Sequence, residues 1–249
     1  MVASPTVYLI SGANRGIGFE ITSQISSRPD VLVFAGARDP SKAEALHALA
    51  KKTGNIEIVK LASANEEDAA AVAKVIEEKA GKVDVVLANA GISDYWGKLD
   101  SQTPANFREM FEVNTLGPLV LFQGIYPVLA KSANPKFLST SSELGSSTAA
   151  SYPIAAYGTS KAALNHIIAH AHQDYPELTD VSFCPGWVST DMGNRGAKAQ
   201  GMEEAPVKVQ DSAAAIIRLA DKSTRETHGG ISGAPSGTRR LRTRHGEVE

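Results

Sequence analysis

Short apolar runs alternate with longer amphipathic segments along most of this chain. Each run is rich in Val, Ile and Leu and is followed by a stretch long enough for a crossover helix. Strands that are apolar without alternation are typical of parallel sheets with both faces covered. The pattern therefore predicts an α/β fold, a doubly wound parallel sheet with helices on both faces. The predicted strands are residues 7–11, 31–37, 56–61, 83–88, 136–141 and 181–184.

Three sequence signals predict where helices begin. Ser41 and Ser63 each precede a glutamate by three positions, which is the capping-box pattern. Thr103 is followed by a proline, which favours a helix start because proline is well suited to the first helical position. These starts agree with the alternation of strands and helices.

The alternation of apolar runs and amphipathic segments stops near residue 228, which divides the chain into a domain and a tail. No linker or repeat interrupts residues 1–228, which we predict to form a single domain. Within it, residues 190–207 lack a clear period and predict a loop with a short helix, suited to a substrate lid. Residues 229–249 are rich in Gly, Ser, Thr and Arg with few apolar positions, so we expect a disordered tail.

Composition narrows the classes of function. The 249 residues carry a formal net charge of -2 with both signs interspersed, which disfavours nucleic acid or a membrane surface as a partner. A single cysteine, Cys184, excludes an internal disulfide. With no recognisable leader and no apolar run of membrane length, we predict a cytoplasmic protein that acts on a small molecule. Association into a homo-oligomer is left open.

Tyr157 and Lys161 stand four residues apart, which places them on one face of a predicted helix. A neighbouring ammonium favours the phenolate and so is expected to lower the pKa of the tyrosine, which helps proton transfer near neutral pH. Taken alone, this spacing fits an exposed structural pair better, because it also occurs by chance. The motifs that accompany it reverse that preference.

A glycine-rich turn follows the first predicted strand. Gly12, Gly16 and Gly18 lie between that strand and the first helix, so the backbone can approach a pyrophosphate at the helix N-terminus. Their spacing is G-x-x-x-G-x-G instead of G-x-G-x-x-G. The position between a strand and a helix favours a dinucleotide site over a plain turn.

The end of the second strand indicates which dinucleotide is bound. An acidic residue there would accept hydrogen bonds from a ribose 2′-hydroxyl, whereas this chain has Arg38, and Arg15 lies in the glycine turn. Two guanidinium groups suit a 2′-phosphate, so we expect NADP(H). Asp39 could serve a ribose instead, but the Pro40 that follows suggests that it points away.

Taken together, the motifs resemble those of the classical short-chain dehydrogenases/reductases. They occur in the order of that family and cover most of the chain, and the last of them resembles the branch of sniffer-type carbonyl reductases and fungal norsolorinic acid ketoreductases. The resemblance implies a Rossmann-type fold. The motifs are SGANRGIG at residues 11–18, ANAG at 88–91, VNT at 113–115, SSELG at 141–145, YGTSK at 157–161 and PGWVSTDM at 185–192.

The resemblance also implies a role for each matched residue. Tyr157 would protonate the carbonyl oxygen, Lys161 would tune that phenol and hold the nicotinamide ribose, and Ser142 would bind the substrate oxygen. Asn114 would complete a proton relay through water to Lys161. The expected cofactor contacts are Gly12, Asn14, Arg15, Ile17, Gly18, Arg38, Asn89, Ala90, Gly91, Tyr157, Lys161, Pro185, Gly186, Val188 and Thr190.

Three departures from the family pattern stand out. Ser142 precedes Tyr157 by fifteen positions where the family usually has thirteen, although Ser142 alone has the S-x-x-G context. Ala62 and Ser63 follow the third strand where the family commonly has an aspartate that binds adenine. The usual last strand of the family is not reproduced from Ile231 onward.

Other candidates have ordinary structural explanations. His166 and His170 have metal-compatible spacing but no third ligand motif, so we expect no metal site. Tyr95, Trp96 and Trp187 fit core packing and a role in the substrate pocket about equally.

The sequence thus predicts an NADPH-dependent reductase of ketones or aldehydes. An NADP-dependent alcohol dehydrogenase that works oxidatively is the alternative within the same chemistry. A protein that senses NADPH without catalysis is the alternative outside it, and the intact set of Ser142, Tyr157 and Lys161 disfavours it.

Overall fold

The computed structural model describes residues 4–149, 152–228 and 230–232. Seven parallel strands form one sheet in the order β3-β2-β1-β4-β5-β6-β7. This order reverses direction between β1 and β4, because the chain first builds outward to β3 and then returns to the other side of β1. The strands are β1 (Thr6–Ser11), β2 (Val31–Ala37), β3 (Ile56–Lys60), β4 (Val85–Ala88), β5 (Lys136–Thr140), β6 (Thr179–Phe183) and β7 (Gly230–Ser232).

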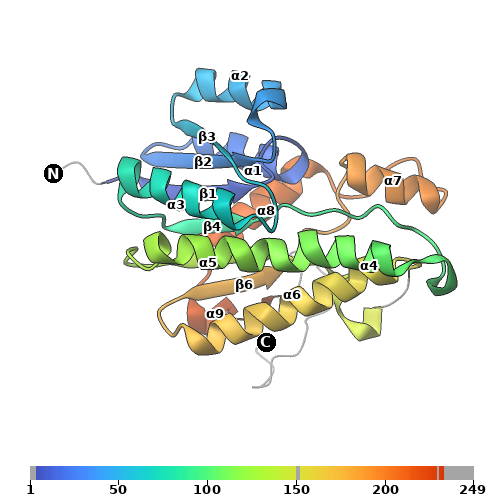
Figure 1. Ribbon diagram of the computed structural model, residues 1–249. Helices are drawn as coiled ribbons and strands as arrows, with labels where there is room; N and C mark the ends of the chain where they lie inside the picture. The colour runs from blue at the N-terminus through green and yellow to red at the C-terminus, as the bar shows by residue number, and fades with distance from the viewer. Residues whose placement is uncertain (1–3, 150–151, 229, 233–249) are drawn as a thin grey trace.

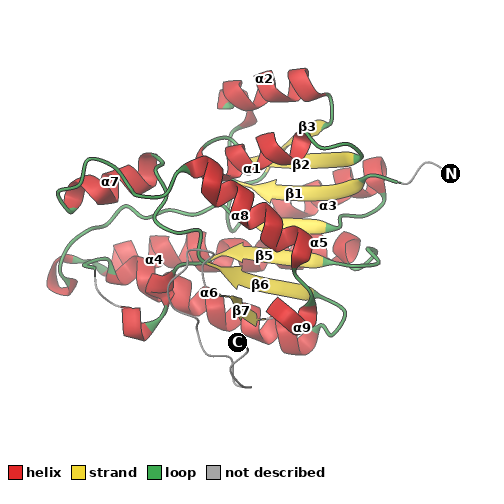
Figure 2. Cartoon of the chain, turned by 180° about the vertical axis from the view of Figure 1, so that it is seen from behind, coloured by secondary structure: helices red, strands yellow, loops and turns green. Residues whose placement is uncertain are grey.

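Helices cover both faces of the sheet. Figures 1 and 2 show α3, α5 and α6 on one face and α1 and α8 on the other. The helices are α1 (Gly16–Ser26), α2 (Glu44–Thr53), α3 (Glu66–Ala80), α4 (Pro104–Phe111), α5 (Gly117–Leu129), α6 (Ala155–Asp174), α7 (Asp191–Ala199), α8 (Val209–Lys222) and α9 (Arg225–His228).

Two apolar clusters fill the space between the layers. Successive strand residues point to opposite faces, so Ile10 of β1 packs toward α1 and α8 while its neighbour Leu9 packs toward α3 and α5. Both side chains are fully buried. Burial on both faces explains why the strands are apolar without alternation, and it confirms the predicted doubly wound α/β sheet.

The six predicted strands are confirmed, and the structure adds one. β7 pairs in parallel with β6, so the expectation of a disordered tail is wrong for residues 230–232. Residues 229 and 233–249, the rest of the predicted tail, lie outside the described residues. Between residues 190 and 207 the structure has the short helix α7, as expected for that segment.

One of the three predicted helix starts is confirmed. Thr103 caps α4 through its hydroxyl and forms a capping box with Asn106. Ser41 instead lies in a 3₁₀ turn before α2. Asn65, not Ser63, caps α3, because its side-chain oxygen accepts from the backbone N–H of Asp68 at 2.7 Å. Both predictions from serine were therefore wrong.

Substitution of Gly124 tests how closely α3 and α5 pack. A Cβ at this position would lie 2.7 Å from the Ala69 Cβ and 3.2 Å from its backbone carbon. We expect Gly124→Ala to lower the free energy of unfolding by about 1–3 kcal/mol in urea titrations, because the helix backbones must separate. Gln123→Ala, at the exposed neighbouring position, should stay within about 0.5 kcal/mol of wild type. Equal stability of the two variants would contradict the close helix contact.

Candidate active site

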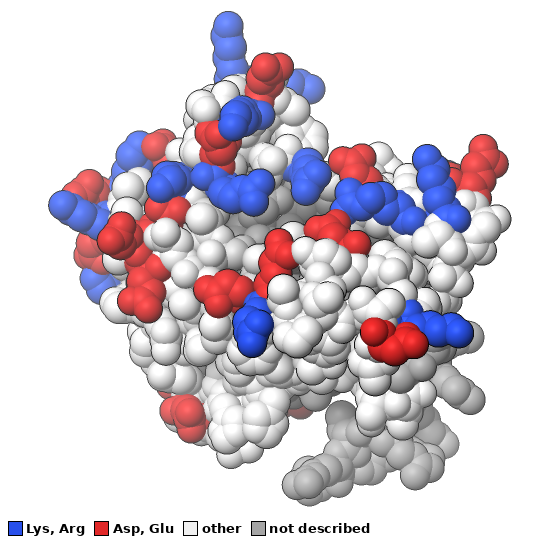
Figure 3. All heavy atoms as spheres, turned by 45° about the vertical axis from the view of Figure 1, so that its right-hand side comes forward, with Lys and Arg blue, Asp and Glu red and all other residues white. Residues whose placement is uncertain are grey.

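The expected site residues gather at the carboxyl ends of β1, β4, β5 and β6. In a doubly wound sheet a crevice forms at this edge, where the strand order reverses. Figure 3 shows this side of the molecule, with a hollow that is flanked by Lys and Arg side chains. The crevice therefore lies where the motifs of the sequence converge.

The turn between β1 and α1 requires glycine at several positions. Gly12 and Gly16 have positive φ angles of 66° and 57°. A Cβ on Gly18 would lie 2.3 Å from the Gly12 carbonyl oxygen and 2.6 Å from the Asn89 Nδ2. The N-terminus of α1 is thus left open to a ligand, with Asn14 and Arg15 exposed beside it and Ile17 partly buried.

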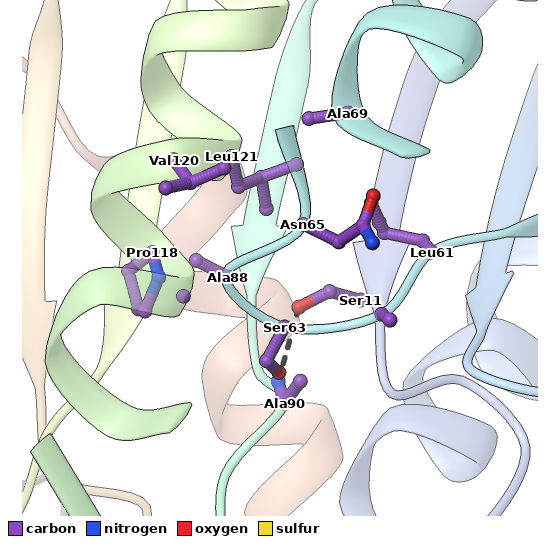
Figure 4. A pocket seen from close by; sticks show the side chains of 12 residues that line it. Ser11, Leu61, Ser63, Asn65, Ala69, Ala88, Ala90, Pro118, Val120 and Leu121 are labelled. Carbon is purple, nitrogen blue, oxygen red and sulfur yellow. Dashed lines mark hydrogen bonds between the residues drawn. The ribbon is translucent and has the colours of Figure 1, made fainter. Parts of the chain in front are cut away.

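Ser11 ties the end of β1 to the end of β4. Its hydroxyl oxygen accepts from the backbone N–H groups of Asn89 and Ala90, both at 3.0 Å, and the Asn89 amide donates to the Ser11 carbonyl at 3.1 Å. Figure 4 shows Ser11 and Ala90 joined in this way at one side of a small pocket. The pocket continues between the loop after β3 and α5, where its lining is mostly apolar.

Lys161 lies under the loop that follows β4. The residue is 3% exposed, and its ammonium donates to the Thr140 carbonyl, at the end of β5, at 2.6 Å. A Cβ on Gly91 would lie 3.7 Å from that ammonium, so a glycine keeps the space above it free. The ammonium lies 5.7 Å from the centre of the Tyr157 ring, one turn earlier on α6.

Ser142 reaches Tyr157 because two glycines let its loop approach α6. A Cβ on Gly158 would lie 2.7 Å from the Leu144 carbonyl oxygen, and a Cβ on Gly145 would lie 3.0 Å from the Lys161 carbonyl carbon. The Ser142 hydroxyl forms a hydrogen bond with the Tyr157 phenol. The structure thus brings Ser142, Tyr157 and Lys161 together despite the longer spacing in the sequence.

Burial controls the protonation of the phenol and the ammonium. It raises the pKa of Tyr157 to about 12, with the Cys184 thiol adding to this and the Ser142 hydrogen bond opposing it. Burial also lowers the pKa of Lys161 to about 8. The expected net lowering of the Tyr157 pKa is therefore not found in this structure, since burial outweighs the influences that favour the phenolate.

Asn114 is buried in a π-helical turn, Glu112–Leu116, between α4 and α5. Its Oδ1 accepts from the Ile92 N–H, and its Nδ2 donates to the Ile92 carbonyl, both at 2.9 Å. Nδ2 also contacts the Ser160 hydroxyl at 3.1 Å. The side chain therefore joins the loop after β4 to α6, while its role in a proton relay stays a prediction.

The loop after β6 closes the crevice from the other side. Pro185 accepts a hydrogen bond from Ser212, and Gly186 has a φ of 84°. Val188 is buried and bridges to Val207. Thr190 caps α7, and its methyl group would meet a Cβ on Gly16 at 3.5 Å. This loop and the glycine turn thus face each other.

The basic residues expected at the ribose end are accessible. Arg38 is exposed, and no ion pair involves it in the part of the chain that the structure describes. Arg15 lies 3.7 Å from Asp191, with both side chains well exposed. Asp39 accepts from Ser41 at 2.6 Å and pairs with Lys42 at 3.0 Å, so its carboxylate is already engaged.

Contacts between α7 and the loop after β4 were not expected from the sequence. Asp94 and Arg195 form an ion pair at 2.6 Å. A Cβ on Gly196 would lie 2.5 Å from the Trp96 ring, so the indole packs directly on the α7 backbone. Trp187 donates to the Gly193 carbonyl at 2.9 Å. No local sequence pattern signals these contacts. Asp94–Arg195 and Trp96–Gly196 join segments that are distant in the chain, and the Trp187–Gly193 bond depends on the path of a loop.

The remaining candidates have structural explanations. The rings of His166 and His170 pack edge to face with centroids 4.8 Å apart. Within residues 4–149, 152–228 and 230–232, no group of three His, Cys, Asp or Glu residues could hold a metal ion. No helix in the same residues is both long and apolar enough to cross a membrane.

Burial of Lys161 predicts a pH-dependent stability of the nucleotide-free protein. The pKa of Lys161 is about 8 in the folded state against 10.5 for an ordinary lysine, so the unfolded chain binds more protons between these values. The free energy of unfolding should therefore rise from pH 8 to about 10. At neutral pH, Lys161→Met should unfold at a higher urea concentration than wild type, with a free energy of unfolding larger by up to about 3 kcal/mol.

Lys74→Met, which removes an exposed lysine of α3, is the matched control and should keep the alkaline rise. Burial also lowers the pKa of Lys136, so a rise as large in Lys161→Met as in wild type would show that Lys161 does not contribute to it.

Comparison with known proteins agrees with this geometry. The family model of the short chain dehydrogenases matches residues 6–201. Short-chain dehydrogenase srdF of Neurospora crassa is 35% identical over 248 residues, which cover 95% of this chain and 98% of that protein. Norsolorinic acid ketoreductase of Aspergillus parasiticus is 35% identical over 234 residues, which cover 90% of this chain and 86% of that protein.

Solved structures give the same result. An NADPH-bound carbonyl reductase from chicken fatty liver has a TM-score of 0.82 at 27% identity, with 93% of this chain and 97% of that chain covered. The carbonyl reductase Sniffer of D. melanogaster has a TM-score of 0.83 at the same identity and coverage. With the ordered motifs and the parallel sheet, these matches show that the chain belongs to the short-chain dehydrogenase/reductase family of nicotinamide-dependent oxidoreductases, in the branch of Sniffer-type carbonyl reductases and fungal norsolorinic acid ketoreductases.

Proposed function

We propose that this protein is an NADPH-dependent reductase of ketones or aldehydes in which Tyr157 donates the proton. The observation that carries the proposal is the meeting of Ser142, Tyr157 and Lys161 at the carboxyl end of β5. A serine hydroxyl hydrogen-bonded to a phenol, with an ammonium 5.7 Å from the centre of the phenol ring, forms a donor set for a developing alkoxide.

The residues of the crevice fit a nicotinamide dinucleotide. Gly12, Gly16 and Gly18 open the N-terminus of α1 to a pyrophosphate, since any Cβ at Gly18 would fill the turn. Gly91 keeps space free beside Lys161, where a ribose hydroxyl can reach the ammonium. The residues that would hold the dinucleotide are Gly12, Asn14, Arg15, Ile17, Gly18, Arg38, Asn89, Ala90, Gly91, Tyr157, Lys161, Pro185, Gly186, Val188 and Thr190.

The protein residues divide the reduction between them. The nicotinamide, when bound, supplies the hydride that adds to the carbonyl carbon. Ser142 donates a hydrogen bond that orients the substrate oxygen, and Tyr157 gives that oxygen its phenolic proton. A pKa of about 12 keeps Tyr157 protonated at neutral pH, which is the form that reduction requires. Lys161 remains mostly charged below pH 8 and stabilises the phenolate that the transfer leaves behind.

Two arginines support the preference for NADPH. The Arg38 guanidinium is exposed at the end of β2, and Arg15 stands in the glycine turn. Asp39 accepts from Ser41 and pairs with Lys42, so its carboxylate already has two partners on its own side of the turn. The similarity to an NADPH-bound carbonyl reductase supports the same choice.

The substrate enters between aromatic residues and α7. The rings of Tyr152 and Trp187 lie edge to face with centroids 5.6 Å apart, beside the loop that carries Thr190. We propose that residues 190–207 act as a lid over this entrance within a catalytic domain of residues 1–228. The similarity to a norsolorinic acid ketoreductase favours a ketone. We also propose a cytoplasmic location, which agrees with the single free cysteine.

Tyr157→Phe tests the proton donor. We expect NADPH oxidation with ketone or aldehyde substrates to fall below about one per cent of wild type, because the ring remains but the transferable proton is gone. NADPH binding, measured by fluorescence, should be nearly unchanged. Tyr126→Phe, whose phenol contacts Glu177 at the surface of α5, is the control and should retain full activity. Turnover above a few per cent in Tyr157→Phe would remove Tyr157 from the chemistry.

Arg38→Asp tests the cofactor preference. A carboxylate repels the 2′-phosphate but accepts from a 2′-hydroxyl, so kcat/KM with NADPH should fall roughly 100-fold while that with NADH rises. Arg218→Asp makes the same charge change on an exposed position of α8 and should leave the ratio unaltered. Equal wild-type efficiency with both cofactors would overturn the assignment of NADPH.

A further inference from the structure

We propose that Asn165 is a positioning residue that holds the Ser142 loop and the Tyr157 helix in register. The proposal rests on the proposed function, because it assigns Asn165 to the alignment of the proton donor with the substrate-binding serine. Asn165 does not touch the reacting atoms; it acts through its neighbours.

The position of Asn165 on α6 follows from helical spacing. Tyr157, Lys161 and Asn165 are separated by four residues each, so the three side chains lie along one face of the helix. That face is turned toward the ends of β5 and β6. Asn165 therefore stands behind the two proposed functional residues, deeper along the helix.

The Asn165 side chain links α6 to two strands at once. Its Oδ1 accepts from the Ser141 hydroxyl and from the Ser182 hydroxyl, each at 2.6 Å. Ser141 is 3% exposed and Ser182 is 1% exposed, and within residues 4–149, 152–228 and 230–232 both hydroxyls have their side-chain hydrogen bond to this one oxygen. Both acceptor positions of the oxygen are filled, which fixes the orientation of the amide.

This link is adjacent to the residues that perform the chemistry. Ser141 directly precedes Ser142, and its backbone N–H donates to the Phe183 carbonyl at 2.7 Å. One residue earlier, the Thr140 carbonyl accepts from Lys161. Residues 140 to 142 are thus fastened to α6 through the Lys161 ammonium, through the Tyr157 phenol and through Asn165. Loss of the Asn165 link leaves them attached to α6 only by the two groups that must also serve the reaction.

No other side chain of α6 bonds to the ends of both strands in the described residues, because Lys161 reaches only Thr140 and His172 reaches only Asp180 of β6. Thr115 donates to the Ser160 carbonyl at 2.8 Å, and Asn114 contacts the Ser160 hydroxyl. Both hold the helix from the side of the π-helical turn, and neither reaches β5. In the described part of the chain, Asn165 is therefore the side chain of α6 that joins the helix both to β6 and to the residue that follows β5.

The test compares Asn165→Leu with Asn165→Asp. Leucine has a similar volume and no acceptor, so we expect kcat to fall roughly 10- to 100-fold while the Kd for NADPH changes by less than about threefold. Aspartate keeps an oxygen that both hydroxyls can reach, so it should recover most of kcat. His166→Leu, at the exposed neighbouring position of α6, is the control and should match wild type. Equal kcat in Asn165→Leu and wild type would overturn the proposal, as would failure of aspartate to rescue.

A double-mutant cycle separates positioning from a general loss of stability. Ser141→Ala alone should lower kcat, and adding it to Asn165→Leu should have little further effect, because both changes break the same contact. Additive losses would contradict a shared role. If Asn165→Leu does not fold, the Ser141→Ala/Ser182→Ala variant removes the donors and keeps the amide, and the same fall in kcat is expected of it.

A measurement without turnover distinguishes this proposal from the proposed function. Loss of the link should loosen residues 140 to 142, whose Thr140 carbonyl holds the Lys161 ammonium, so the alkaline rise in stability of the nucleotide-free protein should shrink in Asn165→Leu relative to His166→Leu. If the wild-type protein reduces no carbonyl compound, the proposed function is overturned. The comparison of the alkaline rise between Asn165→Leu and His166→Leu then still decides whether Asn165 has a positioning role. An unchanged rise would refute the positioning role.

Discussion

A lysine ammonium buried at the carboxyl end of β5 is the constraint on which the rest of the site depends. Burying a charge is costly unless a polar group compensates it, and the Thr140 carbonyl is the hydrogen-bond acceptor that meets the Lys161 ammonium. Because that carbonyl ends a strand, the ammonium fixes α6 against the sheet edge. Once the helix lies there, the Ser142 loop can approach it closely, because Gly145 and Gly158 leave room at the contact.

The same burial shifts the pKa values of the phenol and the ammonium in opposite directions. The pKa of Tyr157 is raised to about 12, so the phenol holds its proton more tightly, and the pKa of Lys161 is lowered to about 8, which is close to neutral pH. One buried site thus holds both the acid that gives up a proton and the cation that stabilises the anion left behind. A dinucleotide in the crevice would add its own charges beside Lys161, so these values belong to the nucleotide-free protein.

Most of the fold could be predicted from local patterns. β1, β2 and β4 are nearly continuous apolar runs, which are typical of strands buried on both faces, and β3, β5 and β6 have shorter apolar runs among polar residues. β7 was missed because Gly230–Ser232 is too short to show a pattern, and its pairing depends on β6. The caps at Ser41 and Ser63 were predicted wrongly because the chain between strand and helix contains extra turns that a spacing rule does not register.

The candidate site shows the same division between local and distant contacts. Tyr157, Lys161 and the glycine turn could be assigned because each motif is contiguous in the sequence. Asn165 and the Asp94–Arg195 ion pair could not, because their partners come from segments whose distance is set by strand register and loop path. The direction of the Tyr157 pKa shift was also beyond the sequence, since it depends on how deeply the phenol is buried.

Direct observation of hydride transfer tests the central claim, that this site reduces a carbonyl group with Tyr157 as proton donor. The protein is incubated with NADPH deuterated at the transferable position of the nicotinamide and with a panel of aldehydes, quinones and aromatic ketones, and the products are examined by NMR. We expect deuterium on the carbinol carbon of at least one aldehyde or ketone with wild-type protein, and none with Tyr157→Phe. Products without deuterium, or the same labelling by both proteins, would contradict the claim.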